Sequence, residues 1–152
     1  MPQAHALAET LDSPAPDEDE LKPQPVRLRV TGRRALAFTG TLIGLATSEQ
    51  PASPFWWELA IYRTTAGSFA AAVKLVSRAA DGRDIHSAYE GETLDALADK
   101  LEAHDCSADM DALRHGEAAS PLDALAHRLR QAEAARQYRG LIGETLFAFD
   151  SF

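Results

Sequence analysis

Two apolar segments joined by a short turn place the strongest constraint on how this chain can fold. Residues 55–63 and 68–76 are rich in aromatic and branched side chains, and each alternates apolar with polar or small residues. This pattern is typical of β-strands, and the three-residue loop 65–67 between them predicts a β-hairpin. Gly67 suits the left-handed position that ends such a loop, because it has no Cβ to clash.

The loop also predicts the register of the hairpin, with Ile61 opposite Ala71 and Glu58 opposite Lys74. The second pair joins opposite charges and supports the alignment, which a slip of one residue would break. The expected core face contains Trp57, Leu59, Ile61, Phe69, Val73 and Leu75. The other face contains Trp56, Ala60, Tyr62, Ala70 and Ala72. This second face is apolar for a surface, so we expect something to cover part of it.

Further strands are expected on both sides of the hairpin. Residues 26–30 alternate strictly and predict a first strand, and residues 35–47 predict a second. Gly40 and Gly44 interrupt the second segment, which predicts a bend there, since glycine inside a strand often marks a bulge. A turn at Asp81-Gly82 precedes a last predicted strand over residues 85–89, whose register the pattern leaves open.

The remainder of the chain is predicted to be helical. Thr93 caps a helix from Leu94 to about His104, and a short helix over residues 107–114 follows. Ser120 and Pro121 then start a helix that we expect to run to about Arg139, where Gly140 and Gly143 loosen it. Its expected buried side includes Leu122, Leu125, Leu129 and Tyr138.

Length and composition fit one α+β domain preceded by a tail. The chain has 152 residues, 45% of them hydrophobic, which is enough to build a core without disulfides. Residues 1–25 are acidic and rich in proline, so we expect a flexible tail. Residues 26–152 would form the domain, with a sheet of four or five antiparallel strands over 26–90 and a helical part over 93–152.

Within that domain we expect the helix from Leu94 to cover one face of the sheet. The C-terminal helix would pack at an edge or across the second face. The chain contains no apolar stretch of membrane-spanning length and no leader sequence. We therefore expect a soluble cytoplasmic protein that does not contact membranes.

The net charge of −8 is distributed unevenly. Residues 26–89 carry four acidic and eight basic side chains, whereas residues 90–117 carry nine acidic and two basic ones. The simplest interpretation is a set of ordinary solvated faces. A more specific one is an acidic surface that attracts a basic partner.

Two groups of residues are candidate interaction sites. On the second sheet face, Trp56, Tyr62 and Arg63 could contact a partner or stack on single-stranded nucleic acid. At the C-terminus, Phe147, Phe149 and Phe152 either dock on the sheet or anchor a partner. For nucleic acid, the candidate contacts in the basic strands are Arg27, Arg29, Arg33 and Arg34.

No motif points to an enzyme. The sequence contains no phosphate-binding glycine loop, dinucleotide fingerprint, nucleophile elbow or HExxH motif. His104, Cys106, Asp109 and His115 are metal-ligand types, but their spacing matches no closed zinc pattern, and a solvated helix end explains them better. The acids around Cys106 disfavour a thiolate. We expect no metal and no cofactor.

The hairpin region resembles a group of small uncharacterised bacterial proteins carried on plasmids and other mobile elements. The shared pattern is Phe-x-Gly at residues 38–40, Ser-Glu at 48–49, Trp-x-Glu-Leu at 56–59, and Tyr-Arg-Thr at 62–64 before the glycine turn. It covers about a third of the chain and excludes the C-terminal helix. The chain has Val76-Ser77-Arg78 where those proteins have Gly-Arg. The resemblance implies an α+β fold and a mobile-element setting, with no assigned activity.

Three functions are compatible with these observations. The leading hypothesis is a non-enzymatic protein-interaction module, such as a mobile-element inhibitor or accessory factor acting on a host protein complex, and a homodimer is compatible with it. The alternative is a nucleic-acid-binding module that uses the basic strands. The third is a small enzyme with no recognisable motif.

Overall fold

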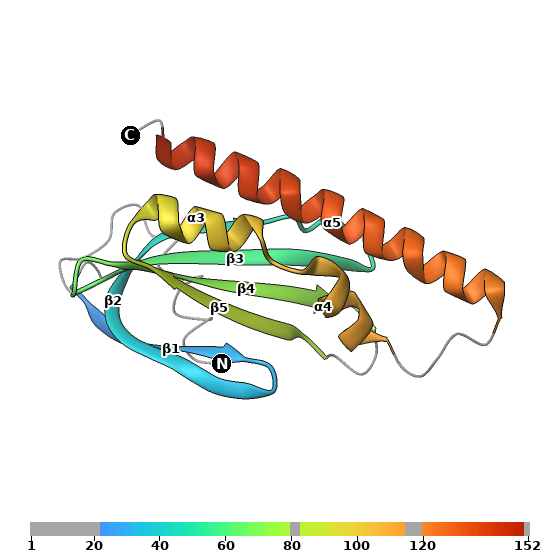
Figure 1. Cartoon of the computed structure of the whole chain (residues 1–152), viewed down its shortest axis with the longest axis horizontal. Coiled ribbons are helices and arrows are strands. Elements are labelled where there is room, and N and C mark those ends of the chain that lie inside the picture. The colour runs from blue at the N-terminus through green and yellow to red at the C-terminus, as the bar shows by residue number, and fades with distance from the viewer. Residues whose placement is uncertain (1–21, 80–82, 115–119, 151–152) are drawn as a thin grey trace.

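The structure, a computed structural model, describes residues 22–79, 83–114 and 120–150. Within these ranges five strands precede three helices, which confirms the predicted α+β class (Figure 1). The elements are β1 (Gln24–Val30), β2 (Arg33–Thr47), β3 (Phe55–Thr64), β4 (Phe69–Ser77), β5 (Ile85–Gly91), α3 (Leu94–Glu102), α4 (Cys106–Leu113) and α5 (Pro121–Asp150). The predicted turn at Asp81-Gly82 and most of the predicted tail lie outside the described residues.

The strands form one sheet in the order β1-β2-β3-β4-β5, and every neighbouring pair is antiparallel. The predicted register of the central hairpin is confirmed, since Ile61 pairs with Ala71 and Glu58 with Lys74. Gly67 has a φ of 87°, in the left-handed region that the turn requires. Lys74 Nζ lies 3.7 Å from Glu58 Oε1, so the charges that predicted the register meet across the strands.

The predicted bend in β2 is a β-bulge. The pairing of β2 with β3 shifts between Leu42 and Gly44, which leaves Ile43 as the extra residue. On the N-terminal side of the bulge, β1 and the first part of β2 curl beneath the rest of the sheet (Figure 1). The turn after β1 then reaches β5, where Thr31 N donates to His86 O at 2.9 Å and His86 N donates to Thr31 Oγ1 at 2.8 Å.

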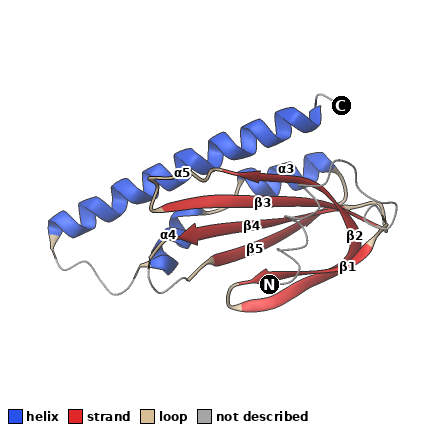
Figure 2. Cartoon of the chain, turned by 180° about the vertical axis from the view of Figure 1, so that it is seen from behind, coloured by secondary structure: helices blue, strands red, loops and turns tan. Residues whose placement is uncertain are grey.

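The main core lies between the sheet and the helices. Trp57, Ile61 and Leu75 are completely or almost completely buried on the predicted face. They pack in one cluster with Leu97 and Leu101 of α3 and with apolar residues of α4 and α5. All three helices therefore cover the same face of the sheet, as Figure 2 shows from behind.

The opposite face is covered by the curled hairpin of β1 and β2. Val26 and Leu28 of β1 are buried against Tyr62 and Ala70 of the central strands. The expected position of the C-terminal helix at an edge or across this face is wrong. That helix completes the first face instead, because Ala134, Tyr138, Leu141 and Ile142 fill the part of the core that α3 leaves open.

The helix boundaries follow local capping signals at their N-termini. Thr93 accepts a hydrogen bond from Ala96 N, and Ser120 Oγ accepts one from Asp123 N at 3.1 Å. At the C-terminus, α5 continues to Asp150, so the predicted end near Arg139 is wrong. Burial of apolar residues beyond Arg139 outweighs the cost of each glycine in the helix, which is about 1 kcal/mol.

The packing of α3 predicts a specific loss of stability. Replacing Leu101, which is fully buried, by alanine should lower the free energy of unfolding by about 2–5 kcal/mol, because it leaves a cavity in the main core. The neighbouring Glu102 is exposed, and Glu102→Ala should change this free energy by less than about 0.5 kcal/mol. Urea denaturation followed by circular dichroism measures both. Equal losses would contradict this packing.

Candidate functional site

The main candidate site is an apolar stripe on the outer face of α5. Leu122, Leu125 and Leu129 are spaced three and four residues apart and therefore lie on one side of the helix. Their exposed fractions are 72%, 52% and 62%. Phe147 follows Leu129 by 18 residues, which is five helical turns, and is 73% exposed on the same side. We call these four residues the α5 stripe.

The α5 stripe is exposed because polar contacts turn the other side of the helix toward the protein. Near its N-terminus, His127 Nε2 lies 2.7 Å from Asp111 Oδ1 of α4. One turn later, Gln131 Nε2 donates to Ser107 O at 3.2 Å. His127 is buried, and the apolar residues of the second half continue on its side. The expectation that Leu122, Leu125 and Leu129 are buried is therefore wrong, and α5 is an outer layer of the molecule (Figure 1).

A groove of about 880 Å³ runs beside the α5 stripe, and Leu129 of the stripe contributes to its wall. It lies between α5 and the loop from β2 to β3, and residues of that loop from Ser48 to Pro54 form its opposite wall. Ser48 Oγ donates to Gln137 Oε1 at 3.2 Å at its base. On the helix side, Arg136 Nε donates to Glu133 Oε1 at 2.7 Å, and this hydrogen bond lowers the pKa of Glu133.

The aromatic residues predicted as contacts on the second sheet face are not available to a partner. Trp56 is buried, with its indole N–H donating to Glu58 Oε2 at 3.0 Å and the Arg78 guanidinium 4.4 Å from the ring centroid. Tyr62 is buried against Phe38, with ring centroids 5.5 Å apart. β1 and β2 cover Tyr62, and the Arg78 side chain lies over Trp56, so the interaction assigned to these two residues is corrected to burial within the protein.

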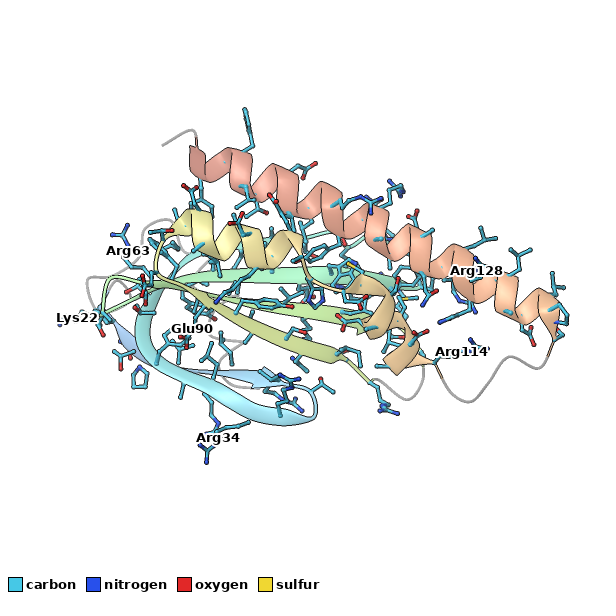
Figure 3. The ribbon with its side chains drawn as sticks, viewed as in Figure 1. Lys22, Arg34, Arg63, Glu90, Arg114 and Arg128 are labelled. Atoms are coloured by element: carbon cyan, nitrogen blue, oxygen red, sulfur yellow. The ribbon has the colours of Figure 1, made fainter. Side chains whose placement is uncertain are left out.

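Arg63 is exposed at the end of β3, with its guanidinium 5.6 Å from the Phe69 ring centroid (Figure 3).

The three predicted C-terminal phenylalanines do not form one site. Phe149 is half-buried and packs on the main core, where its ring leaves no room for a Cβ at Gly44. Phe147 is exposed, and Phe152 lies outside the described residues. Only Phe147 of these three is placed on the α5 stripe.

The four predicted nucleic-acid contacts share one hairpin. Arg27, Arg29, Arg33 and Arg34 are all exposed on β1 and β2, and Figure 3 shows Arg34 pointing away from the sheet. Residues 22–47 contain five basic and no acidic side chains. The hairpin covers the face of the sheet opposite the helices (Figure 2). We call this segment the basic hairpin.

A small hollow of about 380 Å³ extends the basic hairpin at the end where it meets β5. Arg29, Arg83 and His86 contribute basic side chains to its wall, and Asp84 contributes a carboxylate. Burial lowers the pKa of His86, and the charges of Arg29 and Lys74 lower it further. The positive charge of this hollow near neutral pH therefore comes from its arginines.

His104 is buried in a polar cluster, so the expectation of a solvated helix end is wrong. Its Nδ1 contacts Tyr89 Oη, and its Nε2 lies 2.6 Å from Asp109 Oδ2. The side chain is 4% exposed, and its ring packs edge-on against Trp57 at 5.7 Å between centroids. One ring nitrogen therefore contacts β5 and the other contacts α4, which indicates that the cluster holds these two elements together.

The described residues hold no group of three or more His, Cys, Asp or Glu side chains that could bind a metal ion. His115, one of the predicted ligand types, lies outside the described residues. Cys106 is buried, and burial together with Asp109 and Asp105 raises its pKa to about 12. A thiol with that pKa is protonated near neutral pH and is a poor nucleophile.

Comparison of the chain with protein-family models, with curated proteins and with solved structures finds no match. Among the helices that the structure describes, none combines the length and the apolar character needed to cross a membrane.

The environment of Cys106 predicts slow thiol chemistry. In the folded protein at pH 8 we expect Cys106 to react with 5,5′-dithiobis(2-nitrobenzoate) at least about 100-fold more slowly than in urea, because it is buried and protonated. The absorbance of released thionitrobenzoate measures both rates. Similar rates in folded and unfolded protein would show that the thiol is accessible.

Proposed function

We propose that this protein is a non-enzymatic protein-interaction module that binds its partner through the α5 stripe. The observation that carries the proposal is the exposure of three leucines and one phenylalanine along one side of a single helix. A row of exposed large apolar side chains is typical of interaction surfaces and is costly to leave in water. Helices that bind proteins commonly use anchors spaced three, four and seven residues apart, as these leucines are.

The surroundings of the α5 stripe support the same function. The adjacent groove offers carboxylate, guanidinium and amide groups along its length, which suits the polar rim of a protein interface. The resemblance of the hairpin region to mobile-element proteins favours an accessory factor, with a host protein or a second copy of the chain as the partner. The Tyr89, His104 and Asp109 cluster does not favour an enzyme, since its groups are buried against each other.

Photocrosslinking inside the expressing cell tests the interaction. A benzoyl-phenylalanine placed at Leu125 should give a covalent adduct with a protein, because this position lies in the middle of the three leucines. The same residue placed at Glu102, which is exposed on α3, is the matched control and should give none. Denaturing gels and mass spectrometry identify the adduct. Lack of any adduct at Leu125, or equal adducts at both positions, would contradict the proposal.

The basic hairpin favours a second candidate function, binding to nucleic acid. Within the described residues, the structure gives the side chains of Arg27, Arg29, Arg33 and Arg34 no hydrogen-bond or ion-pair partner. Unpaired arginines on one surface attract phosphates, and the binding that results weakens with salt. The hairpin and the α5 stripe lie on opposite sides of the molecule, so one function does not block the other (Figure 1).

For this second function we expect a single-stranded oligonucleotide to bind with an affinity that falls steeply as salt rises, with a slope of about 0.7 per phosphate contact. Replacing the four arginines of the hairpin by serine should abolish this binding. Arg128→Ser together with Arg130→Ser, on α5, is the matched control and should have little effect. Fluorescence anisotropy measures both. Equal weakening by the two sets would exclude a specific site on the hairpin.

A further inference from the structure

The composition of the exposed side of α5 points to what covers it. Gly140 and Gly143 follow Leu122 and Leu125 by 18 residues, or five turns, and so lie on the same side as the α5 stripe. A Cβ added at either glycine would meet nothing within 4 Å, so the fold of one chain has no need of glycine there. Glycine disfavours a helix interior, so a close approach by another molecule would explain why these two positions have no side chain.

The order of side chains along this side is complementary to itself. It begins with three leucines, carries Glu133 and Arg136 at its middle, continues with the two glycines and ends with Phe147. If a second copy lies antiparallel, with a two-fold axis between Glu133 and Arg136, the two leucines nearest the axis meet the two glycines. Leu129 faces Gly140 and Leu125 faces Gly143, and Leu122 faces Phe147 at each end.

Charge is complementary at the same position. Glu133 of one chain faces Arg136 of the other, on both sides of the axis. The Arg136 side chain is 69% exposed while it contacts Glu133 of its own chain, so it can also reach a carboxylate of the second copy. A two-fold axis makes both copies use the same patch, which requires this kind of self-complementarity.

We propose that the α5 stripe is the interface of an antiparallel homodimer, in which the leucines of each chain pack over Gly140 and Gly143 of the other. This inference rests on the proposed function, because it names the partner of the same surface. The contact from Leu122 to Phe147 is about 38 Å long. α5 covers the outside of the helical layer, which is where a second copy would meet it (Figure 2).

Charge reversal tests the pairing of Glu133 with Arg136. The full chain should sediment as a dimer at about 100 µM. Glu133→Arg and Arg136→Glu should each weaken dimerisation by about tenfold or more, because each places like charges on both sides of the axis. An equimolar mixture of the two variants should restore a dimer that contains one of each. Failure of the mixture to associate more tightly than its components would overturn the proposed register.

Gly140 supplies a test that separates the dimer from the stability of the chain. Gly140→Leu should raise the thermal midpoint of dilute, monomeric protein, since leucine favours a helix and the position is open. The same change should weaken dimerisation by about tenfold or more, because the new side chain would occupy the space of Leu129 of the second copy. Unchanged dimerisation would overturn the contact.

Disulfide trapping tests the direction of the helices. Mixed Leu122→Cys and Phe147→Cys chains should form a disulfide between copies on mild oxidation, whereas Leu122→Cys alone should not, because its two sulfurs would be about 38 Å apart. The buried Cys106 serves as an internal control that stays reduced. A disulfide in Leu122→Cys alone would overturn the antiparallel arrangement.

The two proposals fail differently in these experiments. A chain that stays monomeric at every concentration, yet forms an adduct with another protein at Leu125, would overturn the homodimer and leave the interaction module standing. A monomer without any adduct would overturn both.

Discussion

The Trp57 side chain links every layer on the helical side of the molecule. It is completely buried near the start of β3, where its indole N–H donates to Ala134 O of α5 at 2.9 Å. Its ring packs edge-on against His104, between α3 and α4, and against Tyr138 of α5. An aromatic ring of this size contributes a large buried area, and its single donor needs a partner inside the core. Trp57 therefore connects the central hairpin directly to α5 and to the residues that hold α3 and α4.

Polar groups inside this core are satisfied by a small number of partners. Tyr138 Oη donates to Leu101 O at 2.6 Å, and burial raises the pKa of Tyr138. His104 contacts Tyr89 on one side and Asp109 on the other. Among the described residues, no buried side-chain nitrogen or oxygen lacks a partner. Such a network favours one arrangement of the helices, because any other arrangement would leave buried polar atoms unpaired.

Sequence reasoning succeeded where the interactions are local and failed where tertiary placement decides. The register of β3 and β4 follows from a three-residue loop and cross-strand pairs, all close in sequence. In α5, by contrast, Leu122, Leu125 and Leu129 form one helical stripe and Ala134, Tyr138 and Leu141 form another on the opposite side. Both have helical spacing, and only contacts with α4 and the sheet determine which one is buried. Likewise, Gly40 and Gly44 predicted a bend in β2, but not that β1 would curl over Tyr62.

The curl of the sheet also affects its two edges. Strands β1 and β5 end the sheet, and an exposed edge strand offers unpaired N–H and C=O groups to strands of other molecules. Here the curl brings the two edges toward each other, and Thr31 and His86 exchange hydrogen bonds between them. Strand addition at that position would have to displace these bonds. The fold thus protects part of its own edges against amyloid-like growth.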